Sequence, residues 1–362
     1  MPDEFSGKNR NMNILFIASD NDRASGAFLS MVRLCSILKN TYKHSVYVLV
    51  QRPGDGQILL EEQGIPVYYK RAYNWIARIK EFDGLKNRVE RNIKRVLNKK
   101  SVYEYIKLIK ELEIEIVHIN TSWTYIGAVA AKRVGVPYVW HIREFLEEDQ
   151  NVRMWNRNYG YRLISDAEKV ITISDSIYQK YKKLVKKEKL LTIYNGIDAD
   201  TFYSQTHGIL DKKEYLFLII GFISEPKGQW QLIEAASILR KKGYSNFKIK
   251  IVGKGQEAYV ENLRNKVHKL ELEAYIEFCG YRSDAADLYK KADITFVCSK
   301  AEAFGRVTVE AMMGGSLVIG ADIAATRELI DDHKTGLLYK SEDPNDLARK
   351  IEWTLNHMNE AK

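Results

Sequence analysis

The sequence predicts an α/β protein with two Rossmann-like domains that face each other across a cleft. Apolar runs rich in Val, Ile and Tyr alternate with segments of helical periodicity. This alternation stops in a polar stretch near residues 199–213 and then restarts, as it would at a boundary between two domains. The chain has 362 residues, which is too long for one typical hydrophobic core.

The first domain is expected over residues 13–199. It begins with the run NILFIAS (13–19) and a helical segment, GAFLSMVRLCSILKN. The further expected strands are SVYVLV (45–50), PVYYK (66–70), IEIVHIN (114–120), PYVWHI (137–142), KVITIS (169–174) and LLTIYNG (190–196). These runs are continuously apolar, which is typical of strands buried on both faces of a parallel sheet.

The second domain is expected over residues 213–343, with a C-terminal helix over 344–362. Its expected strands are YLFLIIG (215–221), FKIKIVG (247–253), YIEFCG (275–280), ITFVCS (294–299), SLVIGA (316–321) and TGLLYK (335–340). Helices are expected between them, for example over Gln229–Lys242 and Ala258–Leu270. Ligands of open α/β sheets bind beyond the carboxyl ends of the strands, so functional residues should follow strands.

Residues 70–100 depart from this rhythm. Apolar residues recur every three or four positions among many Lys and Arg residues, and Gly84 is a possible break. One interpretation is a domain helix with a solvated outer face. The other is a helix over 75–100 that docks on an anionic membrane surface or holds an anionic, lipid-linked substrate.

Composition narrows the function classes. The formal charge of +9 allows an anionic substrate, an anionic membrane face or nucleic acid, but no nucleic-acid module is recognisable. The three cysteines have no metal-binding or disulfide spacing and are expected to be buried thiols in a reducing, cytoplasmic compartment. No run of about 18 apolar residues predicts a membrane-spanning helix, and MPDEFSGKNRNM lacks the apolar core of a signal peptide.

The most informative segment is KAEAFGRVTVEAMMGG (300–315), which follows a strand and opens a helix. Its helix N-terminus could hold a phosphate, and Gly305 would let the backbone approach a ligand. Glu302 and Glu310 would be about 12 Å apart on one straight helix, so we expect a bent path that lets them bind different parts of one polyhydroxy ligand. The alternative is that both carboxylates are structural or solvated.

Other strand ends carry similar features. Gly26 opens a helix after SDNDRAS, Lys227 and Gly228 follow GFISEP, and Gly255 lies in VGKGQ. His141, Arg143 and Glu144 form a polar cluster where WHIREF ends a strand, with His141 expected to point at the cleft. Two D-x-D matches, Asp20/Asp22 and Asp198/Asp200, lack a third acidic partner, so we expect no metal site there.

Together these motifs resemble the retaining glycosyltransferases of family 4, which have the GT-B fold. The strongest match is EAFGRVTVEAMMGGSLVIG, which is similar to the family's E-x7-E element. YNGID, the Lys-Gly pair at 227–228, IVGKG, F-x-G at 278–280 and ADITFVCS follow in the family's order. The resemblance extends from about Asn13 to about Asn356 and implies transfer of a sugar from a UDP- or GDP-sugar to a glycan or lipid-linked glycan, in surface polysaccharide assembly and without a metal.

The resemblance also implies roles for individual residues. Glu310 would bind the ribose, and Glu302 would face the transferred sugar together with His141 near the reaction centre. The implied donor contacts are Gly26, Lys227, Gly255, Arg282, Phe304, Gly305, Arg306 and Val307, with Lys227 at the diphosphate. The candidate acceptor contacts are Asn120, Arg143 and Glu144.

The sequence departs from the family pattern at three places. Phe222 stands where the family often has an arginine, Ala324 and Ala325 stand where glycines are common, and the family commonly has more helix after LARKIEWTLNHM. Two alternatives therefore stay open beside the transferase. One is a sugar-nucleotide epimerase of the same architecture, and the other is a non-catalytic subunit that binds a sugar nucleotide.

Overall fold

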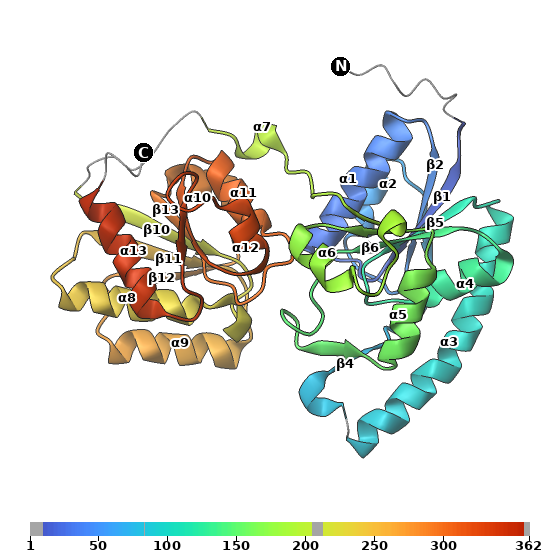
Figure 1. Cartoon of the computed structure of the whole chain (residues 1–362), viewed down its shortest axis with the longest axis horizontal. Helices are drawn as coiled ribbons and strands as arrows, with labels where there is room; N and C mark the ends of the chain where they lie inside the picture. Colours follow the sequence, from blue (N-terminus) through green and yellow to red (C-terminus); the bar gives the residue numbers. More distant parts are fainter. Residues whose placement is uncertain (1–9, 83, 205–212, 358–362) are drawn as a thin grey trace. The chain divides into compact units, whose positions relative to one another are not determined.

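The computed structural model describes residues 10–82, 84–204 and 213–357. The chain divides into two compact units, residues 1–194 and residues 195–362 (Figure 1). Each unit is built around its own parallel β-sheet with helices packed against it, so we describe each by itself. The predicted α/β class and the two Rossmann-like sheets are confirmed.

Unit 1 contains a seven-stranded sheet in the order β3-β2-β1-β5-β6-β8-β9. All neighbouring strands in it are parallel. The strands are β1 (Asn13–Ala18), β2 (Ser45–Val50), β3 (Val67–Tyr69), β5 (Ile116–Asn120), β6 (Tyr138–Ile142), β8 (Lys169–Thr172) and β9 (Leu190–Thr192). The helices are α1 (Gly26–Asn40), α2 (Gln57–Glu61), α3 (Leu85–Glu111), α4 (Ile126–Val134), α5 (Arg157–Asp166) and α6 (Asp175–Tyr181), with short 3-10 turns η1 (Ile79–Glu81) and η2 (Lys187–Lys189).

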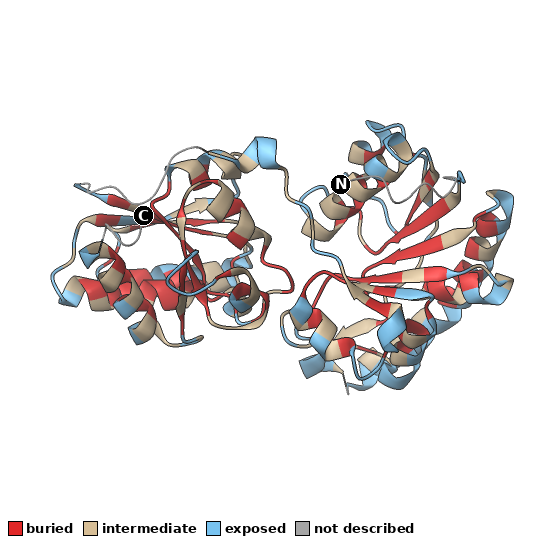
Figure 2. Cartoon of the chain, turned by 45° about the horizontal axis from the view of Figure 1, so that its top comes forward, coloured by how far each residue is buried: buried red, intermediate tan, exposed pale blue. Residues whose placement is uncertain are grey.

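The central strands of unit 1 are buried on both faces, which explains their unbroken apolar sequence (Figure 2). Leu15, Phe16 and Ile17 are consecutive in β1, and none of them is exposed. The strand order reverses at β1, which has β2 on one side and β5 on the other. Side chains that follow β1 and β5 therefore meet at a topological switch point.

The segment predicted as one amphipathic stretch over 70–100 is only partly helical. Residues Ile76–Arg78 form β4, which pairs antiparallel with β7 (Val152–Met154) in a separate two-stranded sheet. Gly84 is the N-cap of α3, so the helix begins after it and continues to Glu111, well beyond the predicted end. The break expected at Gly84 is confirmed. The helical spacing before Gly84 was misleading, because that segment contains β4, which pairs with the distant strand β7.

Unit 2 contains a six-stranded parallel sheet in the order β12-β11-β10-β13-β14-β15. Its strands are β10 (Tyr215–Ile220), β11 (Phe247–Val252), β12 (Ile276–Gly280), β13 (Ile294–Val297), β14 (Leu317–Ala321) and β15 (Leu337–Tyr339). Its helices are α7 (Ala199–Phe202), α8 (Gln229–Lys241), α9 (Glu257–Lys269), α10 (Ala285–Lys291), α11 (Arg306–Met313), α12 (Ala324–Leu329) and α13 (Pro344–Asn356), with the 3-10 turn η3 (Glu225–Lys227). The order reverses at β10, between β11 and β13, which makes a second switch point.

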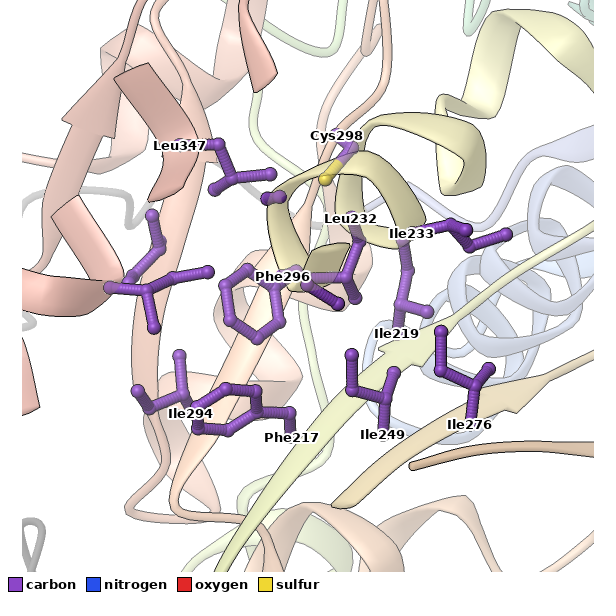
Figure 3. Packing of buried hydrophobic residues seen from close by; sticks show 14 of the residues in the cluster. Phe217, Ile219, Leu232, Ile233, Ile249, Ile276, Ile294, Phe296, Cys298 and Leu347 are labelled. Atoms are coloured by element: carbon purple, nitrogen blue, oxygen red, sulfur yellow. The ribbon is translucent and has the colours of Figure 1, made fainter. Parts of the chain in front are cut away.

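The core of unit 2 fixes the sheet against α8 and α13. Phe217 of β10 stacks on Phe247 of β11 with ring centroids 5.3 Å apart, and Phe296 of β13 meets it edge-on at 5.4 Å. Leu232 of α8 and Leu347 of α13 are fully buried in the same cluster (Figure 3). This rigid packing holds the loops that leave β10 and β13, where the predicted site residues lie.

Within the described residues, no helix is long and apolar enough to cross a membrane.

Candidate functional site

Two loops meet at the switch point of unit 2. Lys227 ends η3 after β10, and Glu302 lies in the loop after β13; Lys227 Nζ is 2.9 Å from Glu302 Oε1. Both side chains are mostly buried, with exposed fractions of 25% and 18%. Ser299 Oγ donates to the same carboxylate oxygen. The ion pair therefore lies within the fold at the edge where ligands of such sheets bind.

Backbone contacts hold the two loops to each other and to α12. The Lys300 amide donates to the Pro226 carbonyl at 2.7 Å, and the Ala325 amide donates to the Glu302 carbonyl at 3.2 Å. Gly228 has a φ of 70°, and a Cβ there would lie 2.1 Å from the Cys298 carbonyl oxygen. Only glycine allows this approach, so the Lys-Gly pair positions the lysine.

Glu310 lies on α11, eight positions after Glu302, and it is only 8% exposed. Its Oε1 accepts from Arg306 Nη2 at 2.9 Å, and its Oε2 accepts from the Tyr289 hydroxyl at 3.4 Å. Burial and the nearby Glu310 carboxylate raise the pKa of Tyr289 well above its usual value, which keeps the phenol protonated as a donor. The two glutamates therefore have separate partners and are not a proton-sharing pair.

The turn between the glutamates begins α11. Gly305 is the N-cap with a φ of 79°, a left-handed conformation that favours glycine. The following helix presents its N-terminal amides and positive dipole end. Arg306 Nη1 is buried and has no hydrogen-bond partner in the described part of the chain, so this guanidinium could still bind an anion.

The other predicted donor residues of unit 2 are placed differently. Phe304 is buried, and Val307 packs on the core, so only their backbone could reach a ligand. Gly255 forms a bridge with Ile223. Arg282 follows β12 and is held by Asp284, with Nη2 2.6 Å from Oδ2, and this pairing lowers the pKa of Asp284 to about 2.

The departures from the family pattern are visible in unit 2. The Phe222 side chain is 52% exposed, while its carbonyl accepts from Gln229 Nε2 at 3.1 Å. Ala324 has a φ of 48° at the start of α12, an unusual conformation for a residue other than glycine.

A polar cluster lies at the ends of β5 and β6 in unit 1. Arg143 Nε donates to Asn120 Oδ1 at 2.7 Å, and Arg143 Nη2 lies 3.2 Å from His141 Nδ1. His118 Nε2 lies 3.2 Å from the same nitrogen. The structure thus brings Asn120, His141 and Arg143 together, as a combined site requires, and adds His118, which the sequence did not indicate.

These contacts fix the protonation of His141. An arginine only donates, so Nδ1 of His141 is an acceptor, and the proton of the neutral ring is on Nε2. Burial, with help from the Arg143 charge, holds the pKa of His141 well below its usual value and lowers that of His118 to about 3. His141 Nε2 is buried and has no hydrogen-bond partner among the described residues. His141 is therefore a neutral N–H donor and a poor general base.

Glu144 occupies a different environment from its neighbours. Its Oε1 accepts from the Ser122 backbone amide, and burial raises its pKa to about 7 against the lowering effects of Ser122 and Arg143. Thr121, before Ser122, has a φ of 125°, which is unusual for a β-branched residue. The Thr121 hydroxyl donates to Ser19 Oγ at 2.8 Å across the β1–β5 switch point. Strain of this kind is found at functional sites, and nothing in the sequence indicated it.

Gly26 and the aspartate pairs have structural partners. Gly26 is the first residue of α1, whose N-cap Ser25 accepts from the Phe28 amide. Asp20 accepts from Ser25, and Asp22 accepts from the Ala24 amide. Asp198 accepts from the Thr201 hydroxyl. In the described ranges, no three His, Cys, Asp or Glu side chains form a group that could hold a metal ion.

Comparison with known families matches both units. The model described as Glycosyltransferase Family 4 matches residues 26–201, and the model described as Glycosyl transferases group 1 matches residues 204–362. The chain is similar to a Campylobacter jejuni α-1,4-N-acetyl-D-galactosaminyltransferase that is named for a diphosphoundecaprenol-linked glycan. The two are 28% identical over 264 residues, which is 72% of this chain and 70% of the relative.

A second relative is an Escherichia coli UDP-Gal:α-D-GlcNAc-diphosphoundecaprenol α-1,3-galactosyltransferase, 26% identical over 271 residues, or 70% of this chain and 69% of the relative. Among solved structures, Anabaena HepE in complex with UDP superposes with a TM-score of 0.77 at 21% identity, covering 97% of this chain and 92% of that one. HepE has also been solved with UDP-glucose, and that structure gives a TM-score of 0.75. These superpositions establish the GT-B fold.

Proposed function

Because the chain belongs to the glycosyltransferases that join a Family 4 domain to a group 1 domain, we propose a retaining enzyme that transfers a sugar from a UDP- or GDP-sugar to a lipid-linked glycan. The observation that carries this proposal is the Lys227–Glu302 ion pair, held where the loops after β10 and β13 meet. Surface polysaccharide assembly is the process in which such a product would be used.

The donor contacts follow from charge and hydrogen-bonding capacity. The ribose hydroxyls would donate to Glu310, which Arg306 and Tyr289 hold in place. The diphosphate would lie against the N-terminal amides of α11, from Phe304 to Val307, with Lys227 and Arg306 as cations. Glu302 would accept from hydroxyls of the transferred sugar. HepE binds UDP and UDP-glucose on the same fold, which supports a nucleotide-sugar donor.

The reaction needs stabilisation of the leaving diphosphate. As the glycosidic bond breaks, negative charge grows on the leaving oxygen, and the sugar passes through an oxocarbenium-like state. Lys227 and the α11 amides would stabilise that charge, so we propose that no metal is required. Same-face attack would retain the configuration, with the leaving phosphate accepting the proton of the acceptor hydroxyl. His141 would donate its Nε2–H to a substrate oxygen.

The acceptor is inferred from the relatives and from α3. Both named relatives act on diphosphoundecaprenol-linked glycans. In α3, no described residue before Asn98 is buried, and the exposed side chains include Leu85, Val89 and Ile93 beside many basic residues. An apolar stripe edged with positive charge fits an anionic membrane surface. We therefore propose peripheral attachment through this half of α3, at the cytoplasmic face.

The test combines binding with product analysis. A thermal-shift panel of UDP, GDP, ADP and their sugars should single out one nucleotide, because a ligand stabilises the state that it binds. The matching sugar nucleotide is then incubated with a diphosphoprenol-linked sugar, and the anomeric configuration of the product is read by NMR. Retention supports the proposal, and inversion contradicts it. An epimer formed from donor alone would favour the epimerase. Binding without transfer to any acceptor would favour the non-catalytic subunit, the alternative motivated by Phe222 in place of the family's arginine.

A further inference from the structure

Unit 1 contains a cavity whose lining does not include the His141 cluster. It is a cavity of about 580 Å³, within the usual range for small-ligand pockets. Its lining includes the cationic side chains of Arg52, Arg71, Arg78 and Lys94 and the aromatic rings of Tyr69, Tyr73 and Trp123. No acidic residue is among the described residues that line it. The site is therefore suited to an anion that also carries a ring or hydroxyl groups.

The fold explains why these side chains converge. Ser19 follows β1, Arg52 follows β2 and Arg71 follows β3, so three neighbouring parallel strands end at this cavity. The short sheet of β4 and β7 contributes Arg78 and Val152, and α3 contributes Lys94. The cavity thus begins at the carboxyl edge of the sheet and reaches the helix that we assign to the membrane surface.

The four cationic side chains of the cavity differ in their ion-pair partners. Arg78 pairs with the exposed Glu81 at 3.4 Å, and Lys94 pairs with Glu90 at 2.5 Å. In the described part of the chain, Arg52 and Arg71 form no salt bridge. The Arg52 charge acts on the Asp20 carboxylate, and Arg71 lies 5.3 Å from the centroid of the Tyr73 ring. Two guanidinium groups that form no salt bridge can bind the oxygens of a phosphate or diphosphate in forked geometry.

A polar acceptor lies at the inner wall. Gln51 is only 2% exposed, its Nε2 donates to Thr124 Oγ1, and its Oε1 has no hydrogen-bond partner among the described residues. Trp123 is fixed through its Nε1, which donates to Gln150 Oε1 at 2.7 Å. An oriented indole ring can pack on the C–H face of a sugar, and a buried amide oxygen can accept from a sugar hydroxyl.

From this arrangement we infer that the cavity binds the diphosphate and first sugar of the acceptor, with Arg52 and Arg71 at the diphosphate and Trp123 and Gln51 at the sugar. The inference rests on the proposed function and adds the place in the fold where the anionic end of the acceptor is held. The transferred sugar and the donor diphosphate use other residues, so the two binding events can be measured separately.

The test uses the full chain with Lys227→Ala, so that the donor site contributes little to diphosphate binding. Calorimetry with inorganic pyrophosphate, and separately with a short-chain prenyl diphosphate N-acetylhexosamine, gives the two affinities. The double variant Arg52→Gln with Arg71→Gln should bind the prenyl compound at least tenfold more weakly than the Lys227→Ala parent. The matched control removes two exposed charges of unit 1 that lie outside the cavity, Lys110→Gln with Arg133→Gln, and should bind as the parent does.

The outcomes separate the cavity from the reaction. Prenyl diphosphate sugar that binds at least tenfold more tightly than pyrophosphate supports an acceptor site, while equal affinities mean a simple anion site and overturn the assignment. With Lys227 restored, the arginine pair variant should raise the KM for acceptor at least tenfold and leave the KM for donor unchanged. If transfer proceeds with an unchanged acceptor KM, the cavity assignment fails and the function stands. If the compound binds but no sugar is transferred, the assignment stands and the function fails.

Discussion

Lys227 Nζ lies 2.9 Å from Glu302 Oε1, and both side chains come from loops at one end of the unit 2 sheet. The carboxylate neutralises the lysine before any ligand arrives. A donor diphosphate must therefore share the lysine with Glu302 or displace it. The two residues should consequently differ in their effects on binding and on transfer, although they form one ion pair.

Lys227→Ala should weaken nucleoside diphosphate binding about 10- to 100-fold, the usual worth of a hydrogen bond to a charged group, and should abolish transfer. Glu302→Gln should bind the diphosphate at least as tightly as the parent, because it removes a competing charge, and yet transfer poorly. Titration calorimetry and a transfer assay give both numbers. Lys248→Ala, at the opposite end of β11, is the matched control. Equal losses of binding in the Lys227 and Glu302 variants would refute the division of roles.

Glu310 should be the residue that detects the ribose. The parent should prefer the nucleoside diphosphate over its 2′,3′-dideoxy form by about tenfold or more, since a buried carboxylate would lose its donors. Glu310→Gln should reduce this preference, and Glu310→Ala should remove it. Tyr289→Phe removes only a 3.4 Å contact and should keep most of it. The binding constants of the two nucleotides test this prediction. An undiminished preference in both Glu310 variants would show that the ribose binds elsewhere.

The exposed half of α3 should bind anionic vesicles. Sedimentation with phosphatidylglycerol vesicles should exceed that with neutral phosphatidylcholine and should fall as salt rises, because surface charges are screened. Replacing Leu85, Val89 and Ile93 by Ser should reduce binding several-fold. Ile37→Ser with Tyr42→Ser removes exposed apolar side chains elsewhere in unit 1 and is the control. Equal sedimentation with both lipids would contradict membrane docking through charge.

Glu144 should make unit 1 less stable as the pH rises. Its folded pKa is about 7 and its ordinary value is 4.5, so the folded state binds more protons than the unfolded state between these values. Its contribution is fully present below about pH 4.5 and is lost as the pH rises through 7, a change of about 3 kcal/mol. Glu144→Gln removes this titration and keeps an acceptor for Ser122.

Thermal unfolding of parent and Glu144→Gln should be compared from pH 5 to pH 8. The variant should gain several degrees relative to the parent across this range. The difference between the two proteins isolates Glu144 from the buried histidines, whose lowered pKa values destabilise both proteins as the pH falls below about 6.5. A constant difference would show that Glu144 does not titrate in this window.

Much of the fold could be predicted from the sequence because its signals are local. The strands of both sheets are apolar without interruption, as burial on both faces requires, and nearly all expected strands lie where the structure has them. The segment before Gly84 shows the limit of such reasoning. Its apolar spacing resembled a helix, but Ile76–Arg78 pairs with Val152–Met154, a partner far away in the chain.

For the candidate site, local sequence patterns indicated which residue types lie near the strand ends: Lys227 after β10, Glu302 and Glu310 around the start of α11, and the His141–Glu144 cluster at the end of β6. The partners of these side chains could not be predicted and are seen only in the folded chain. Lys227 forms an ion pair with Glu302, and Glu310 forms one with Arg306. His118 lies against His141. Arg52 and Arg71, which follow different strands, line the same cavity. The reason is physical, because hydrogen bonds, burial and pKa values depend on which distant segments the sheet order brings together, and no local pattern encodes that order.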